Sequence, residues 1–171
     1  MDVRFINPFI AATKTVFKTM VATEINIGRP SVIPANGEQT ADVSAVIGMS
    51  GDAVGSVVLS LPMQTACNLG SKFAGVTLTQ DHPDFSDALG ELANMVAGQA
   101  KSRFDGLNVS ISLPSVIIGR KHVVSQSKAK PRLALPCSCD LGQFTVEVVL
   151  VTEKAYANSN ESAATLAGSV G

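Results

Sequence analysis

The sequence contains few of the side chains from which self-contained active sites are usually built. Its 171 residues include two histidines, three cysteines, one tyrosine and no tryptophan. Nucleophiles, general bases and metal ligands are therefore scarce. An enzyme made from this inventory would have to use carboxylates and amides, or take part of its chemistry from a partner. A small-molecule enzyme is disfavoured further because the phosphate-binding motif G-x-x-x-x-G-K-[ST] is absent.

Charge is also sparse and nearly balanced. Charged residues make up 16% of the chain, and the formal net charge is −1. Binding to nucleic acid requires a surplus of Lys and Arg, and no aromatic residues lie among the basic ones for base stacking. We therefore expect no nucleic-acid partner. No stretch reaches the roughly 18 apolar residues of a membrane span, so we expect no membrane partner.

Three cysteines are too few, and odd in number, for a disulfide-rich secreted fold. The first residues do not form a secretory signal, so we expect a reduced, cytoplasmic location. Hydrophobic residues, at 46%, are sufficient for a buried core. We expect a single domain over residues 1–153. The small and polar composition of residues 154–171 predicts a disordered tail.

Hydrophobic periodicity and turn signals predict the order of the elements. Asn7 and Pro8 are typical of a helix start, and Gly75 is a stop signal for the second helix. The predicted helices span 8–23, 62–73 and 83–104, and the predicted strands span 42–49, 55–61, 109–113, 115–119, 132–139 and 142–152. Residues 24–41 are expected to form a linker with a short edge strand. This order predicts an α+β fold, with helices packed on one face of a mostly antiparallel sheet.

The third predicted helix has two faces. Its apolar stripe contains Phe85, Leu89, Leu92, Val96 and the aliphatic stem of Arg103. Its second stripe contains Asp87, Glu91, Asn94, Gly98 and Lys101. Because successive residues are rotated by about 100°, the stripes point apart, and Glu91 and Asn94 should be neighbours on the exposed side.

Two glycines lie inside this helix, where each costs about 1 kcal/mol relative to alanine. Gly90 and Gly98 would keep the helix surface low, so that another backbone could come close. The pattern alone also allows a solvated face with incidental glycines. Acidic residues at the helix start, Asp81, Asp84 and Asp87, are explained by the positive end of the helix dipole without a cation site.

Residues 87–98 read DALGELANMVAG, and Pro114 follows some twenty residues after Asn94. This arrangement resembles the signature of the CheC/CheX/FliY family of chemotaxis phosphatases: an acidic residue or serine, a glutamate, an asparagine three residues later, and a distant proline. Pro114 lies slightly closer to the asparagine than the family pattern. The single copy resembles CheX, the resemblance extends over about residues 1–153, and it implies a CheC/CheX-like fold.

The resemblance implies a phosphatase that dephosphorylates a phospho-aspartyl, CheY-like response regulator. Because the regulator holds the phospho-aspartate, a Mg²⁺ ion and a lysine, no cofactor or metal is expected on this chain. Asn94 matches the asparagine that orients the attacking water, and a neutral amide suits this role because phosphate repels a carboxylate. Glu91 matches the glutamate that pairs with the regulator's lysine. Asp87, Gly98 and Lys101 share this face and are expected to contact the partner.

CheX relatives form homodimers by extending the sheet across protomers, so a homodimer is expected here. An alternative function remains open. The same fold could serve as a non-catalytic module that binds a response regulator or acts as a scaffold. A phosphate-release assay would separate the two functions.

The cysteines, the histidines and a basic segment allow only less specific predictions. Cys137 and Cys139 fall on one side of a predicted strand and are expected to fill apolar space, since Cys67, His82 and His122 do not have metal-ligand spacing. His82 is expected to be a surface or capping residue. Around His122, the predicted loop within 120–132 carries the basic residues Arg120, Lys121, Lys128, Lys130 and Arg132. This loop is either a solvated surface or an electrostatic guide for an acidic partner.

Overall fold

A computed structural model of the protein describes residues 5–34, 40–124 and 132–152. The predicted tail and residues 125–131 of the basic stretch lie outside these ranges. The helical elements are α1 (Ile6–Val16), the π-helical turn η2 (Phe17–Val21), α2 (Met63–Ala74) and α3 (Phe85–Lys101). The strands are β1 (Asn26–Ile27), β2 (Ser31–Ile33), β3 (Thr40–Gly51), β4 (Ala53–Leu61), β5 (Val109–Ile111), β6 (Ser115–Val123), β7 (Arg132–Cys139) and β8 (Gly142–Thr152).

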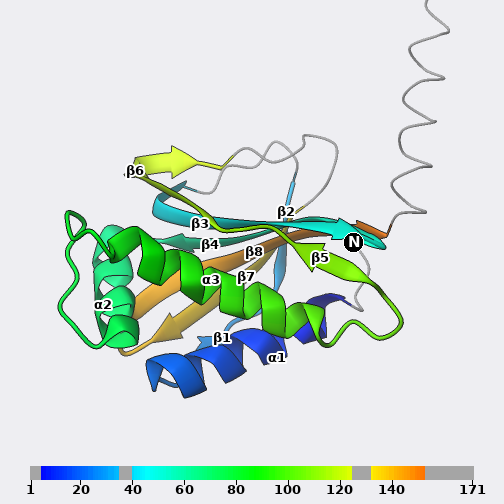
Figure 1. The fold of residues 1–171 in the computed structure, drawn as a ribbon, viewed down its shortest axis with the longest axis horizontal. Helices are drawn as coiled ribbons and strands as arrows, with labels where there is room; N and C mark the ends of the chain where they lie inside the picture. Colours follow the sequence, from blue (N-terminus) through cyan, green and yellow to red (C-terminus); the bar gives the residue numbers. More distant parts are fainter. Residues whose placement is uncertain (1–4, 35–39, 125–131, 153–171) are drawn as a thin grey trace, which may run out of the picture.

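All described strands belong to one sheet, and every pairing between them is antiparallel. The order is β1-β7-β8-β4-β3-β5, with β2 also paired to β7 and β6 also paired to β3 (Figure 1). The hairpins β3–β4 and β7–β8 join through the long β4–β8 pairing, which runs from Ala53 opposite Thr152 to Ser60 opposite Thr145. The predicted antiparallel sheet is confirmed.

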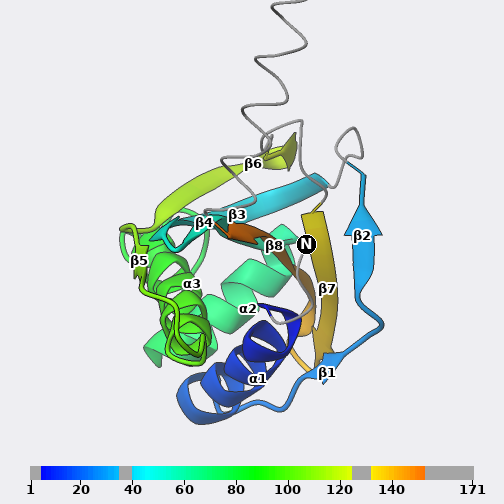
Figure 2. The same cartoon turned by 90° about the vertical axis from the view of Figure 1, so that its right-hand side faces the viewer.

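The helices lie on one side of this sheet, which curls around them (Figures 1 and 2). Alternating residues of the central strands point toward the helices, as the strand period of two requires. The core between the layers contains fully buried Phe9, Phe17, Phe85, Leu92 and Leu135. The predicted packing of helices on one face is therefore confirmed, and α3 lies with one long side against the sheet.

The first helix begins earlier than the Asn7–Pro8 signal predicts. It starts at Ile6, and Phe5 occupies the cap position without a side-chain cap. Phe5 is buried and packs edge-on against the ring of Phe104, with ring centroids 5.2 Å apart. Burial of this aromatic ring outweighs the capping preference of Asn7. The helix then continues into η2, which ends at Ala22 in the left-handed conformation.

The second helix is capped by a residue from another element. Pro62 precedes α2 and has no cap hydrogen bond, but the Asp42 carboxylate on β3 accepts a hydrogen bond from the backbone N–H of Met63 at 3.1 Å. Asp42 also accepts a hydrogen bond from the N–H of Lys121 at 3.0 Å. These hydrogen bonds, the one from Lys121 first, lower the pKa of Asp42. At the other end, Gly75 adopts the left-handed conformation and stops α2 as predicted.

The segment predicted as a linker, 24–41, contributes more structure than a single edge strand. Both β1 and β2 pair with β7, and β3 begins at Thr40. The strand predicted over 115–119 continues to Val123 as β6, because pairing with β3 extends it after a register shift between Ala41 and Val43. Among the described residues, no helix is long and apolar enough to cross a membrane.

Candidate functional site

The candidate site lies on the exposed side of α3. The opposite side is buried as predicted, with Phe85, Leu89, Leu92 and Val96 packed in the core. Arg103 does not extend this apolar stripe, because α3 ends at Lys101 and Arg103 is exposed beyond it. Its place is taken by the small residues Ala93, Ala97 and Ala100, which let α3 pack closely in the core.

Glu91 and Asn94 are neighbours on the exposed side, as their spacing predicts. The Asn94 amide Nδ2 donates a hydrogen bond to the Glu91 carboxylate Oε2 at 3.3 Å. Glu91 is exposed and Asn94 is half-buried, so both side chains remain accessible from solvent. The pair combines a charged acceptor with a neutral amide on a rigid, well-packed helix, which is a suitable support for positioning a reacting group.

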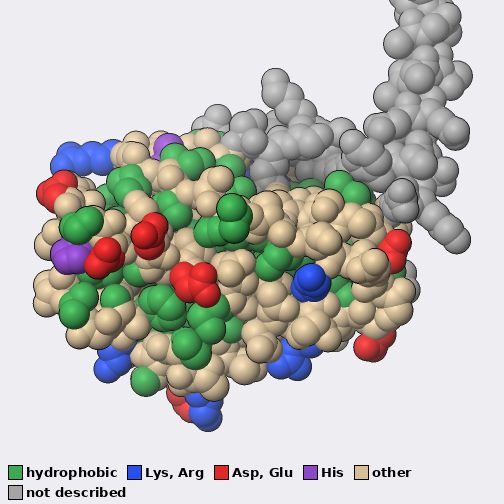
Figure 3. Space-filling model, viewed as in Figure 1, with side chains coloured by type: hydrophobic (Ala, Val, Ile, Leu, Met, Phe, Trp, Pro, Cys, Tyr) green, Lys and Arg blue, Asp and Glu red, His purple; other side chains and the backbone are tan. Residues whose placement is uncertain are grey.

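The same side of α3 carries the other three residues predicted to contact a partner. Asp87 is exposed in the first turn, while Gly98 and Lys101 are half-buried farther along. Figure 3 shows this side of the molecule, with acidic side chains along α3 and hydrophobic surface beside them. The five residues of the predicted stripe therefore lie along one helix face.

The two glycines of α3 lie close to another segment of the same chain. A Cβ atom at Gly90 would lie 3.2 Å from Cβ and Cγ of Pro114, and one at Gly98 would lie 3.9 Å from Cδ1 of Ile111. The close approach expected at these glycines is therefore made internally at Gly90, by the connection between β5 and β6. The connection runs beside α3 (Figures 1 and 2). Pro114, the proline of the family motif, thus packs against Gly90, the residue that precedes Glu91 in α3.

The acidic residues at the start of α3 are all exposed: Asp81, Asp84 and Asp87. Asp84 occupies the cap position without a side-chain cap. The backbone N–H of Asp84 instead donates to Nδ1 of His82 at 3.2 Å, so His82 stabilises the turn before α3 and does not cap an N–H group of the helix itself. In the described parts of the chain, no three His, Cys, Asp or Glu side chains are grouped to hold a metal ion.

The predicted basic loop is divided by the fold. Arg120 and Lys121 are exposed on β6, whereas Lys128 and Lys130 lie outside the described residues. The expectation for Arg132 is wrong, because this side chain is 5% exposed at the start of β7. His122 is also engaged in the fold: its ring nitrogens lie 2.8 Å from the carbonyl oxygen of Gly119 and 2.8 Å from the hydroxyl of Ser44.

Arg132 belongs to a buried polar cluster that the sequence pattern does not predict. Its guanidinium lies 3.2 Å from the carboxylate of Glu147, and the hydroxyl of Ser60 donates to the same carboxylate at 2.8 Å. Desolvation raises the pKa of Glu147, against the opposing effects of the Ser60 hydrogen bond and the Arg132 charge. A lone glutamate within the apolar strand β8 was the available signal. The cluster is structural in character, because it lies within the sheet and away from α3.

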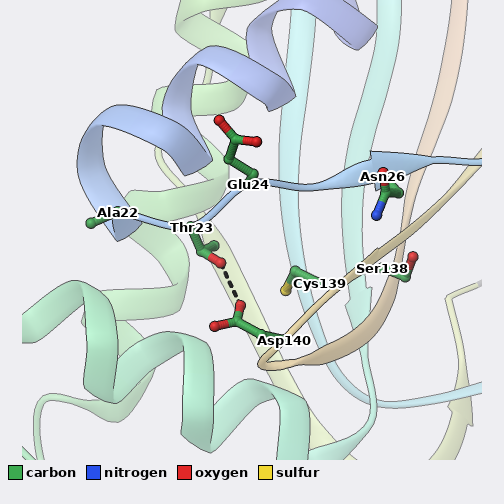
Figure 4. A pocket seen from close by; sticks show the side chains of 7 residues that line it. All are labelled: Ala22, Thr23, Glu24, Asn26, Ser138, Cys139 and Asp140. Atoms are coloured by element: carbon green, nitrogen blue, oxygen red, sulfur yellow. Dashed lines mark hydrogen bonds between the residues drawn. The ribbon is translucent and has the colours of Figure 1, made fainter.

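The cysteines occupy the places expected of small apolar side chains. Cys137 is buried and Cys139 is half-buried against the core, and Cys67, Cys137 and Cys139 are all free thiols. Cys139 also lines a surface pocket of about 420 Å³ beside the β7–β8 turn (Figure 4). There the Thr23 hydroxyl donates to Asp140, while Glu24 points away from Asp140 and pairs with Lys18 at 3.1 Å. These acidic groups have separate partners and do not converge on one ligand.

Comparisons with known proteins show the family and the fold of this chain. The sequence model of the family described as chemotaxis phosphatase CheX matches residues 43–138. A putative chemotaxis protein from Desulfovibrio vulgaris Hildenborough is 36% identical, with a TM-score of 0.78 over 86% of this chain and 96% of that chain. A chemotaxis protein CheX from Desulfovibrio desulfuricans is 33% identical, with a TM-score of 0.78 over 87% of this chain and 99% of that chain. The chain belongs to the CheX family of chemotaxis phosphatases.

A more distant structure has the same fold. CheX in a CheX–CheY–BeF3–Mg complex from Borrelia burgdorferi is 23% identical, with a TM-score of 0.72 over 85% of this chain and 97% of that chain. No match was found among curated proteins. The resemblance stated from residues 87–98 and Pro114 is therefore confirmed at the level of the family and the fold.

Proposed function

We propose that this protein dephosphorylates a phospho-aspartyl, CheY-like response regulator through Glu91 and Asn94. The observation that carries the proposal is the hydrogen-bonded Glu91–Asn94 pair on the accessible face of α3 in a chain of the CheX family. The related CheX of Borrelia burgdorferi was crystallised in complex with CheY, BeF3 and Mg²⁺. This relative supports a receiver domain as the partner, and we propose that the required Mg²⁺ belongs to that partner.

The proposed reaction is hydrolysis of an acyl phosphate. Water attacks phosphorus, the bond from phosphorus to the aspartyl oxygen breaks, inorganic phosphate leaves and the aspartate carboxylate is restored. Such reactions are accelerated mainly by positioning and electrostatics, and an amide can orient the attacking water because its oxygen accepts a hydrogen bond from that water. Asn94 would supply that amide. Being neutral, it can approach the phosphoryl group without charge repulsion.

Glu91 is proposed to pair with the lysine of the receiver. That contact would fix the register of α3 against the receiver and place Asn94 beside the phosphoryl group. Both roles need an accessible side chain, which agrees with the exposed face on which the pair lies. Asp87, Gly98 and Lys101 are proposed to contact the same partner, because they follow one another along this face. No cofactor is proposed for the chain itself.

The test is the decay of a phosphorylated CheY-type receiver with and without this protein. Asn94→Ala should reduce the acceleration by about 100-fold or more, because a correctly placed polar group contributes on that scale. Glu91→Ala should mainly raise the receiver concentration needed for half-maximal rate. Gln99→Ala is the matched control, since Gln99 is exposed on α3 outside the proposed face. Equal decay rates without protein, with wild type and with Asn94→Ala would refute the proposal.

The alternative is a non-catalytic module that binds the receiver or acts as a scaffold. Its signature in the same assay is saturable binding of the receiver without faster loss of phosphate. The intact Glu91–Asn94 pair favours the phosphatase, because a binding module has no need for an amide at this position.

A homodimer remains part of the proposal. Among the described residues, β6 pairs only with β3, and its side chains Ile117 and Ile118 are exposed. An edge strand with apolar residues invites pairing with a second copy. Light scattering at micromolar concentration should give twice the monomer mass, and a monomer would contradict this prediction. A cytoplasmic location is also proposed, because the three thiols are unpaired and suit a reducing compartment.

A further inference from the structure

Leu113 is the most exposed large hydrophobic side chain in the described part of the protein. It is 87% exposed, whereas the next such residue, Val32 on β2, is 64% exposed. Single exposed apolar residues are common on protein surfaces and need no explanation by themselves. What distinguishes Leu113 is the rigidity of its backbone and its place beside the candidate site.

The backbone around Leu113 is held on both sides. The backbone N–H of Ser112 donates to the carbonyl of Gly48 at 2.9 Å, and the N–H of Gly48 donates back to the Ser112 hydroxyl at 2.9 Å. The same hydroxyl donates to the carbonyl of Leu113 at 2.7 Å. On the other side, Pro114 limits the conformations of Leu113 and packs against Gly90. The leucine is therefore presented to solvent from a fixed position, which lowers the entropic cost of binding.

The contacts of α3 place the segment that carries this leucine along the helix stripe that contains Asn94. Gly90, Asn94 and Gly98 are spaced by four residues and form one stripe along the helix. The ends of this stripe face Pro114 and Ile111, so the intervening residues 112 and 113 belong to the segment that runs along the stripe between these two contacts. A partner that brings its phosphoryl group to the Asn94 amide would therefore approach the segment that carries the exposed Leu113 side chain.

The charges on the same face indicate the surface chemistry that a partner needs. Asp84, Asp87 and Glu91 are exposed along the first half of α3. A surface complementary to this face has an apolar area opposite Leu113 and basic side chains opposite the three carboxylates. Figure 3 shows this combination of acidic and hydrophobic surface.

We propose that Leu113 is an apolar anchor for the receiver domain. In the complex, Leu113 would be buried against an apolar area of the receiver that lies next to the phospho-aspartate and is flanked by basic side chains. The inference rests on the proposed function and adds a residue that selects the partner. Leu113 contacts the receiver surface and takes no part in the reaction itself. Its contribution therefore belongs to the affinity for the receiver and not to the rate of the bound complex.

The experiment measures phosphate release over a range of concentrations of a CheY-type receiver kept phosphorylated with acetyl phosphate. Burial of an exposed leucine contributes roughly one to two orders of magnitude in affinity. Leu113→Ser should therefore raise KM by about tenfold to hundredfold and leave kcat unchanged, while Leu113→Met should remain close to wild type. Val32→Ser is the matched control, because Val32 is an exposed apolar residue of β2 at the opposite edge of the sheet.

An unchanged KM in Leu113→Ser overturns the inference, and so does a loss confined to kcat. If Leu113→Ser instead dissociates a dimer without changing KM, the leucine belongs to a subunit contact and the inference is also overturned. A wild-type protein that does not accelerate phosphate loss overturns the proposed function. In that case the Kd of the same variants for the receiver activated with beryllofluoride tests the anchor separately, with the same tenfold to hundredfold loss expected for Leu113→Ser.

Discussion

Asn94 and Glu91 are joined by a hydrogen bond that the proposed docking of a receiver would have to break. At 3.3 Å and in contact with solvent, this bond contributes little to stability, so its loss costs little. Cys137, by contrast, is almost inaccessible to solvent: its thiol lies in the core and donates to the carbonyl of Leu135 at 3.3 Å. At the scale of single residues, accessibility thus separates side chains that can react from side chains that only fill space.

Cys137 should be inert to thiol reagents in the folded protein. Burial raises the pKa of its thiol to about 12. At pH 8 only about one thiol in 10⁴ would then be ionised, and the thiolate is the reactive form. Mass spectrometry after brief treatment with iodoacetamide should find Cys137 unmodified in native protein and modified after unfolding in urea. Rapid modification of Cys137 in the native protein would contradict this assignment.

At the scale of elements, α3 is defined by what packs on each of its sides. Phe85 and Leu92 hold one side against the sheet, while Pro114 packs against Gly90 near the exposed side. Gly90 is therefore required by a contact within the chain. Among the described residues, a Cβ atom at Gly98 would have only Ile111 within van der Waals range, so no described contact requires a glycine there.

Gly98→Ala and Gly90→Val should therefore have opposite effects on stability. Alanine at position 98 has room for its Cβ and removes the conformational cost of glycine, so the free energy of unfolding should rise by about 0.5–1 kcal/mol. Valine at position 90 would press against the ring of Pro114 and should lower it by about 1–3 kcal/mol. Urea denaturation followed by circular dichroism measures both changes. A destabilised Gly98→Ala protein would show that the helix face is more crowded than the contacts indicate.

At the scale of the whole molecule, the sheet has helices on one face and a buried polar cluster on the other. Glu147 alternates along β8 with the core residues Val146 and Val148, so its side chain points away from the helices. It is nevertheless only 2% exposed and is bound by Arg132 and Ser60. A buried charge without a partner is costly, so this ion pair makes the folding of the sheet dependent on both side chains.

Arg132→Met should destabilise the protein by about 3 kcal/mol near neutral pH, because it leaves a buried carboxylate without its cation. Burial raises the pKa of Glu147 in the folded state, so stability falls as the pH rises from the ordinary glutamate range toward that raised pKa. The charge of Arg132 lowers the pKa of Glu147, so loss of Arg132 should raise that pKa further.

The destabilisation of Arg132→Met should therefore be larger at about pH 7.5 than at about pH 4.5, where Glu147 takes up a proton more readily. Urea titrations at the two pH values measure the difference. Arg120→Met, at an exposed position on β6, is the control and should change stability little. A loss in Arg132→Met that does not vary with pH would show that packing of the arginine stem, and not its charge, stabilises the sheet.

The sequence by itself determined the order of the elements, the two sides of α3 and the family. Hydrophobic spacing is local, so it identifies Phe85 and Leu92 as buried, and Glu91 and Asn94 as neighbours on the opposite side of the helix, without knowledge of the fold. The motif around these residues also indicated the chemotaxis phosphatases. Whether Glu91 and Asn94 perform the reaction remains a prediction.

Only the tertiary structure decided which residues meet across long stretches of the chain. Phe5 packs against Phe104 and so extends the start of α1. Pro114 packs against Gly90. Arg132 pairs with Glu147 and is not part of an exposed loop. These pairings join residues from different elements, and their energies come from burial and charge compensation that exist only once the sheet has formed. The scarcity of reactive side chains and the accessible side of α3 can be read from the sequence, but the position of the exposed Leu113 near that side could be found only in the folded protein.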